Sequence, residues 1–294
     1  MTLIELVEAS AQRLAGAGVG FGHGTDNAFD EAAWLVLWQL GLPLDDLDGV
    51  AEMAISPEQQ DSVAELLAER IRSRKPAAYL TREAWLQGVP FYVDERSIVP
   101  RSFIAELLIQ GDIDPWLSEQ TQRVLDLCTG NGSLAVLAAL TYPEVAVDAA
   151  DISEKALEVA RINVDKHALQ ERIRLLRSDG LQSVQGPYDL ILCNPPYVNE
   201  QSMSQLPAEY RAEPALALAG GSDGMDFIHG MLRAAPAHMS EQAVLVLEVG
   251  NERTNFEAAF PKLDAVWLET SAGEDQVLLL TREALQAAFN PEPN

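Results

Sequence analysis

The sequence contains very little cysteine. Its 294 residues include only two, Cys128 and Cys193, and each follows an apolar run that is typical of a strand. Two such cysteines do not indicate the disulfide framework of a small secreted domain. Free thiols suit a reducing compartment, so the sequence predicts a cytoplasmic protein.

Basic residues are also scarce, with 20 Lys and Arg against 45 Asp and Glu and a net charge of −25. Stable binding to a nucleic-acid backbone needs clustered Lys and Arg, so we expect none. A strongly negative field instead attracts a basic partner and speeds encounter with it. Acidity that only keeps a protein soluble gives the same charge, and composition leaves both interpretations open.

Long hydrophobic runs are absent as well, and none approaches the ~20 residues that a membrane-spanning helix needs. The first residues have no basic region and reach Glu5 and Glu8 early, which is not typical of a signal peptide. With 48% hydrophobic residues, the chain can still bury a sizeable core. Its length suits one large domain or two modest ones.

Three kinds of pattern follow one another along the chain. Residues 1–83 show helical spacing, including a helix start at Ser56-Pro57 with Gln59 as capping partner. Residues 84–102 carry short strand-like pieces at 85–86, 91–93 and 98–99 with Gly-Val-Pro and Asp-Glu-Arg turns, which indicates a β-hairpin linker. Residues 103–294 alternate strand and helix, which predicts an α/β domain with a mostly parallel sheet and helices on both faces. The strands expected there are 123–128, 145–150, 173–176, 188–193, 243–249, 265–268 and 276–281.

The first 83 residues show no catalytic constellation. His23 stands between two glycines and is interpreted as a loop residue. The densest basic cluster is Arg70, Arg72, Arg74 and Lys75. Because cations suit a helix C-terminus, we expect a solvated helix end there, with contact to an acidic or RNA partner as the alternative.

The sequence Asn-Pro-Pro-Tyr at 194–197 follows the expected strand 188–193. Two prolines cannot continue a central strand, so Asn194 should lie at its carboxyl end, where ligands bind in open α/β sheets. The Asn194 side chain and the Pro195 carbonyl offer two acceptors, and Tyr197 offers a flat ring. This set suits a planar –NH₂ group that donates two hydrogen bonds. A plain turn is the alternative interpretation.

A second group of residues points to an adenosyl ligand. Residues 126–133 read Asp-Leu-Cys-Thr-Gly-Asn-Gly-Ser at the first strand-to-helix turn, where Gly130 and Gly132 allow close approach of a ligand. Asp151 closes the next strand, where a carboxylate can accept both ribose hydroxyls. Asp179 follows the third strand and suits the adenine edge.

Two cofactors compete for this site. The spacing of Gly130, Gly132 and Ala135 also fits a dinucleotide fingerprint, which would indicate an NAD enzyme. Asp126, however, would repel a pyrophosphate and suits the ammonium of a methionine moiety, and no hydride partner is evident beside Asn194. The predicted cofactor is therefore S-adenosylmethionine, and no metal site is predicted.

Together, residues 126–132, the Ala-Asp-Ile-Ser at 150–153 and the Asn-Pro-Pro-Tyr resemble the class I methyltransferases that modify glutamine side-chain amides in proteins. The resemblance covers nearly the whole chain. Residues 22–27 (Gly-His-Gly-Thr-Asp-Asn), residues 92–96 (Tyr-Val-Asp-Glu-Arg) and Cys128 resemble the PrmB-type branch, which methylates a glutamine of the third protein of the large ribosomal subunit. Asn131 stands where that branch is expected to have Ser.

The resemblance implies a Rossmann-like class I fold in which Asn194, Pro195 and Tyr197 are catalytic. The cofactor-binding residues it implies are Asp126, Cys128, Thr129, Gly130, Gly132, Asp151, Ile152, Asp179, Gly180 and Asn194. The implied substrate-binding residues are Asn194, Pro195, Pro196, Tyr197 and Arg101. Arg101 could equally pair with surface carboxylates.

Three other functions remain open at this point. The relatives that methylate release factors are the nearest, and enzymes that methylate the exocyclic amine of adenine in nucleic acid share the Asn-Pro-Pro-Tyr sequence. A non-catalytic ribosome-assembly factor on the same scaffold is the third. The long polar segment 198–225 is expected to be a substrate lid.

Overall fold

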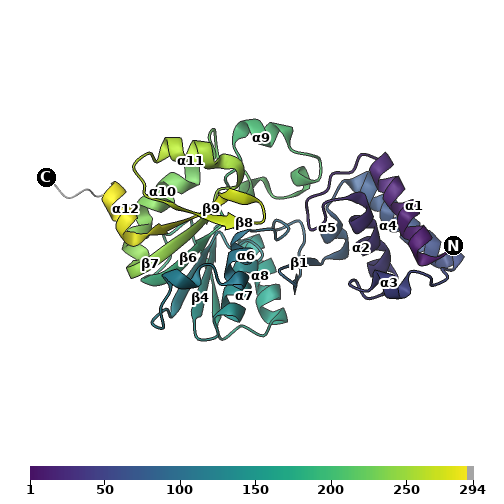
Figure 1. Cartoon of the computed structure of the whole chain (residues 1–294), viewed down its shortest axis with the longest axis horizontal. Helices are drawn as coiled ribbons and strands as arrows, with labels where there is room; N and C mark the ends of the chain where they lie inside the picture. Colours follow the sequence, from purple (N-terminus) through teal and green to yellow (C-terminus); the bar gives the residue numbers. More distant parts are fainter. Residues whose placement is uncertain (290–294) are drawn as a thin grey trace.

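The computed structural model describes residues 1–289. Figure 1 shows helices α1 to α5 at one end of the molecule and the large sheet with its helices at the other. The N-terminal helices are α1 (Leu3–Gly16), α2 (Ala28–Gln39), α3 (Leu47–Val50), α4 (Pro57–Ser73) and α5 (Ala77–Thr81). Their apolar faces form a core of their own, which includes Leu3, Leu14, Leu35 and Val63.

Local capping chemistry sets where these helices begin. The helix α4 starts with the predicted capping box, in which the Gln59 amide N–H donates to the Ser56 hydroxyl and the Gln59 side chain accepts from the Ser56 N–H. Thr2 and Glu5 form the same box at α1. Each box satisfies backbone donors that the first helical turn leaves without partners.

A two-stranded antiparallel hairpin follows α5. Its strands are β1 (Ala84–Leu86) and β2 (Val89–Phe91), and Gln87 and Gly88 form the turn with positive φ. Strand-like pieces are therefore confirmed near 84–91, but residues 98 and 99 are not in a strand. Phe91 and Leu86 pack into the core beneath the large sheet.

The large sheet has seven strands in the order β5-β4-β3-β6-β7-β9-β8, which confirms the mostly parallel α/β fold. The strands β3 to β7 are parallel, and β9 pairs antiparallel with both β7 and β8. Their bounds are β3 (Arg123–Leu127), β4 (Ala146–Asp151), β5 (Ile173–Arg177), β6 (Tyr188–Cys193), β7 (Met239–Glu248), β8 (Val266–Thr270) and β9 (Gly273–Thr281). Each predicted strand is present within a few residues.

Helices cover both faces of this sheet, as the strand–helix alternation predicts. One apolar cluster contains α6 and α7 residues with one face of the central strands, and a second contains α10, α11 and α12 residues with the other face. The helices are α6 (Ile104–Gln110), α7 (Ser133–Thr141), α8 (Glu154–Lys166), α9 (Glu200–Gln205), α10 (Asp226–Ala234), α11 (Arg253–Ala259) and α12 (Arg282–Phe289). Short 3₁₀ turns are η1 (Asp114–Trp116), η2 (Tyr210–Ala212), η3 (Ala215–Ala217), η4 (Ala235–His238) and η5 (Gly250–Glu252). None of the helices within residues 1–289 is long and apolar enough to cross a bilayer.

Candidate active site

A cavity of about 290 Å³ lies at the carboxyl ends of β3, β4, β5 and β6. We call it the strand-end cavity. Its lining includes eight residues that the sequence nominated, namely Cys128, Gly130, Asp151, Ile152, Asp179, Gly180, Asn194 and Pro196. Because these residues come from four separate strand ends, the parallel topology is what brings them together.

Asp151 is the last residue of β4, and backbone amides hold its carboxylate in place. Its two oxygens accept from the Ser153 N–H at 2.8 Å and the Gly130 N–H at 2.9 Å. Burial raises the pKa of this carboxyl, and the backbone bonds counteract the shift. Each carboxylate oxygen keeps a further lone pair, which a hydroxyl donor can reach from the cavity. Gly130 has φ +56° with no atom near its missing Cβ, so the turn leaves open space beside Asp151.

Asp126 lies beneath the turn and does not line the strand-end cavity. It is fully buried, and one of its oxygens accepts from the Thr129 hydroxyl and from the Ala135 N–H. Its other oxygen is buried without a partner among the residues that the structure describes. Burial raises the pKa of Asp126 to about 7. One oxygen of this carboxylate therefore holds the turn and the start of α7 in place, and the other oxygen remains without a hydrogen-bond donor.

The two glycines of the turn have different surroundings. A Cβ on Gly132 would lie 3.1 Å from the Ala160 Cβ and 3.3 Å from the Ala160 Cα of α8. The backbone here approaches a helix, and Gly130 is the glycine that faces the cavity. Cys128 also has φ +63°, a conformation that suits glycine better than a residue with a side chain. The pKa of its thiol is raised, first by contact with the Cys193 thiol and then by burial.

Asn194 follows β6 directly and is half-buried in the cavity wall, whereas Pro195 is buried. Tyr197 does not line the cavity, and its hydroxyl donates to Glu248 at 3.2 Å. Burial and the Glu248 charge raise the pKa of Tyr197. Glu248 also accepts from the Ser102 hydroxyl at 2.6 Å and the Phe103 N–H at 2.9 Å, so the Tyr197 ring is fixed from behind.

Arg101 pairs with a carboxylate and does not line the cavity. Its guanidinium donates to both oxygens of Glu213, at 2.6 and 2.7 Å. The Glu213 side chain is fully buried and that of Arg101 is partly buried, so the partner is a buried carboxylate in place of the surface carboxylates that the sequence suggested. His23 lies 3.5 Å from the same carboxylate and 4.2 Å, ring to ring, from Tyr210. His23 lies in a loop, as interpreted from the sequence, but its side chain is buried, which the sequence did not indicate.

The basic cluster at the end of α4 is not wholly solvated, so the sequence interpretation was wrong for two of its residues. Arg70 is fully buried and pairs with Glu31 at 2.8 Å and Glu209 at 3.3 Å. Arg74 pairs with Glu209 at 2.8 Å. Glu209 belongs to the 198–225 segment, so its 139-residue separation from Arg70 hid the pairing from local patterns. These contacts attach that segment to the N-terminal helices.

Several residues that line the cavity belong to no sequence motif, and they were not predicted from the sequence. The segment 198–225 contributes four of them, Pro214, Leu216, Ala217 and Ala219. Phe227 of α10 and Ile98, which follows the hairpin, also line the cavity. The segment's length and polarity were the only signal for the first four, and nothing local marked the other two.

Comparison with known proteins agrees with this arrangement. Residues 107–212 match the family described as Methyltransferase small domain. The catalytic domain of hMettl16, solved with the MAT2A 3′UTR hairpin 6, has a TM-score of 0.54 at 12% identity, covering 81% of this chain and 84% of that chain. A methyltransferase from Pyrococcus furiosus has a TM-score of 0.50 at 17% identity, covering 76% and 98%. The fold and the site thus define a class I methyltransferase.

Closer relatives cover the whole length. A ribosomal protein uL3 glutamine methyltransferase from Bordetella pertussis is 53% identical over 287 residues, which is 97% of this chain and 96% of that protein. The protein of the same name from Burkholderia pseudomallei is 50% identical over 297 residues, covering 97% and 96%. The chain belongs to the family of ribosomal protein uL3 glutamine methyltransferases.

Proposed function

We propose that the chain transfers a methyl group from S-adenosylmethionine to the side-chain amide nitrogen of a glutamine in ribosomal protein uL3, with the strand-end cavity as the active site. Membership of the uL3 family supports the substrate and separates this function from the release-factor and non-catalytic alternatives. The single observation that carries the site is that Asn194 shares one cavity with Asp151 and Gly130.

The residues present fit this cofactor. Asp151 would accept the ribose hydroxyls, Gly130 and Cys128 would flank the ligand, and Ile152, Asp179 and Gly180 would border the adenine. The unpartnered Asp126 oxygen would accept from the methionine ammonium, although Asp126 does not line the cavity as it stands. Bound S-adenosylmethionine supplies a methyl group on a positively charged sulfur. The cavity volume of about 290 Å³ lies just below the ~300–1,000 Å³ range that is usual for small-molecule pockets.

The chain's own residues position the glutamine. The Asn194 side-chain oxygen and the Pro195 carbonyl would accept the two N–H bonds of the amide, which directs the nitrogen lone pair toward the donor methyl. Tyr197, held by Glu248, would support the amide plane. An amide nitrogen is a poor nucleophile, and holding both reactants in attack geometry can supply roughly 7–11 kcal/mol in good cases. The nitrogen loses a proton once it is alkylated.

The segment 198–225 would exclude water. Its residues Pro214, Leu216, Ala217 and Ala219 already line the cavity, and its buried Glu209 and Glu213 pair with Arg70 and Arg101. We also propose the division into a helical domain (1–83), a hairpin linker (84–102) and a catalytic domain (103–294). Separate apolar cores in the helical and sheet regions support it. A ribosomal substrate and two free thiols suit a cytoplasmic enzyme.

The test is incubation of the full chain with S-adenosylmethionine and recombinant uL3, followed by peptide mass spectrometry. We expect the mass of one methyl group on a glutamine of uL3. Methylation of a co-purified nucleic acid instead would favour the adenine alternative, and no transfer at all would overturn the proposal.

A further inference from the structure

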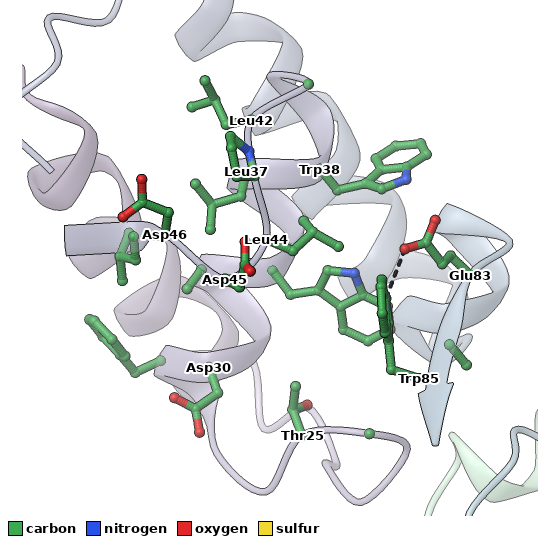
Figure 2. A pocket seen from close by; sticks show the side chains of 18 of the residues that line it. Thr25, Asp30, Leu37, Trp38, Leu42, Leu44, Asp45, Asp46, Glu83 and Trp85 are labelled. Carbon is green, nitrogen blue, oxygen red and sulfur yellow. Dashed lines mark hydrogen bonds between the residues drawn. The ribbon is translucent and has the colours of Figure 1, made fainter. Parts of the chain in front are cut away.

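A second hollow lies in the N-terminal region and shares no residue with the strand-end cavity. Its volume is about 1040 Å³, and it is lined by α2, by residues 41–48 and by the start of β1. We call it the tryptophan groove. Its large apolar residues are Phe29, Trp34, Leu37, Trp38, Leu42, Leu44, Leu47 and Trp85. In the view of Figure 2 the labelled leucines lie between Asp46 on one side and Trp38 and Trp85 on the other.

Two large aromatic side chains in this groove are exposed to solvent, although residues of this kind are usually buried. Trp85 is 47% exposed and Phe29 is 39% exposed. The indole N–H of Trp85 donates to the Glu83 carboxylate at 2.8 Å, which fixes the ring beside a negative charge (Figure 2). A fixed indole beside a carboxylate suits a cationic side chain stacked on the ring.

The indole N–H of Trp34 is the second observation. Trp34 lines the groove, and its Nε1 atom is buried with no acceptor among residues 1–289. A buried donor without a partner is costly, and most such groups in native proteins are paired. Because Nε1 is shielded from solvent, a peptide carbonyl of a partner would reach it once the residues that cover it shift on binding.

The charge of the rim determines the kind of partner. Five carboxylates line the groove, from Asp30, Asp45, Asp46, Asp48 and Glu83, and no Lys, Arg or His is among its lining residues. Nucleic acid and anionic membrane would be repelled here. A second copy of the chain, with a net charge of −25, would also bring like charge to this rim. The groove therefore suits a cationic peptide with apolar neighbours.

We propose that the tryptophan groove binds a cationic segment of uL3 away from the target glutamine. This proposal rests on the proposed function for the identity of the client. A protein that binds ribosomal RNA must neutralise phosphates with Lys and Arg, so it offers such segments. An Arg or Lys of the segment stacks on Trp85 beside Glu83, and an apolar neighbour packs on the exposed ring of Phe29. A backbone carbonyl accepts from Trp34 once the residues that cover its Nε1 atom shift.

This second contact has a consequence for catalysis. Binding at a remote site raises the effective concentration of the glutamine at Asn194 without any change in the chemical step. The groove therefore contributes to the KM for the whole uL3 protein. It contributes nothing to the methylation of a short peptide that carries only the target glutamine.

The test compares the double variant Trp85→Ala/Asp45→Lys with wild type. Both residues are exposed, and neither belongs to the buried core. We expect the KM for recombinant uL3 and its Kd, followed by tryptophan fluorescence, to rise about tenfold or more, because aromatic anchors and paired charges carry much of an interface's affinity. Activity on the short glutamine peptide should stay unchanged, which also shows that the variant is folded.

The matched control is Glu8→Lys, an equal reversal of charge on exposed α1 outside the groove. It should leave the KM for uL3 within about twofold of wild type. Wild-type KM and Kd in the groove variant, or an equal rise in Glu8→Lys, would overturn the groove proposal. Failure of the proposed function has a different signature, in which wild type binds uL3 and the groove variant does not, yet no methyl group is transferred.

Discussion

At the scale of single residues, Asn194 marks the point where the buried sheet meets solvent. The residue before it, Cys193, is fully buried at the end of β6, and Asn194 itself lines the strand-end cavity. Asp151 occupies the equivalent position on β4. One parallel topology therefore places a candidate amide acceptor and a candidate ribose acceptor at the same edge, so the two roles can be separated by mutation.

The substitution Asn194→Ala should lower kcat by about 10²–10³-fold, the usual cost of losing one group that stabilises developing charge. Affinity for S-adenosylmethionine should remain nearly unchanged. Asp151→Ala should do the reverse and weaken cofactor binding first. Calorimetric titration with the cofactor, together with single-turnover rates, separates the two effects. Equal loss of affinity and turnover in Asn194→Ala would mean that Asn194 is a structural residue.

Asp126 makes the stability of the ligand-free protein depend on pH. Burial raises its pKa from 3.8 to about 7, so between these values the native chain holds a proton that the unfolded chain has lost. The free energy of unfolding should therefore fall as pH rises from about 4 to 7. Asp126→Asn removes the buried charge and should stabilise the protein at pH 8 by roughly 1–3 kcal/mol, with little effect near pH 4.

The control for this prediction is Asp148→Asn, which should have the opposite sign. The Asp148 carboxylate accepts from Arg174 at 2.7 and 2.8 Å and from the Tyr188 hydroxyl at 2.6 Å. These partners lower its pKa despite partial burial, so its stabilising effect is present at neutral pH and is lost on acidification through its native pKa. Thermal unfolding from about pH 2 to 8 measures both variants, because the lowered pKa of Asp148 places the loss of its contribution below pH 4. A parallel pH profile for Asp126→Asn and wild type would contradict the assignment.

At the scale of elements, the segment 198–225 is held from outside the catalytic region. Glu209 forms ion pairs with Arg70 and Arg74 of the N-terminal region. Glu213 pairs with Arg101, and His23 lies beside the same carboxylate. Both acids are fully buried in their side chains. The N-terminal region therefore helps to position the segment that lines the strand-end cavity at Pro214 and Leu216.

Glu209→Gln should loosen this segment. Removing one partner of a buried ion pair costs roughly 3–5 kcal/mol, although Arg70 keeps Glu31 and the loss should fall at the low end. We expect faster amide hydrogen exchange in residues 207–219 and weaker cofactor binding. The control Glu200→Gln changes an exposed acid of α9 in the same segment and should alter neither. Unchanged exchange in Glu209→Gln would show that the ion pairs do not hold the segment.

These contacts also show what the sequence could and could not predict. The strands, the capping box at Ser56 and the strand-end positions of Asp151 and Asn194 follow from periodicity and turn chemistry, which are local. The pairing of Arg70 with Glu209 joins residues far apart in the chain, so a basic helix end appeared to be a solvated one. The burial of Asp126 could not be predicted either, because periodicity places a residue on a strand without giving the direction of its carboxylate.

At the scale of the whole molecule, the net charge of −25 produces a field that extends beyond any one contact. Steering by such a field acts on the encounter rate and weakens with ionic strength, because the Debye length falls from ~10 Å at 0.1 M to ~3 Å at 1 M salt. Local contacts in a buried or half-buried site are screened much less. Salt therefore separates the contribution of the whole-molecule charge from that of the tryptophan groove.

We expect kcat/KM for uL3 to fall by about tenfold or more between roughly 0.05 and 0.5 M salt, because a cationic client loses its steered approach. A short, uncharged glutamine peptide should show almost no salt dependence, since it experiences no steering. Glu8→Lys changes the net charge only from −25 to −23, so it should follow the wild-type salt curve closely. The groove variant carries a similar net charge, and it should show a higher KM at every salt concentration with a similar slope. A flat curve for uL3, or an equal slope for the neutral peptide, would mean that the acidity serves solubility and plays no part in recruiting the client.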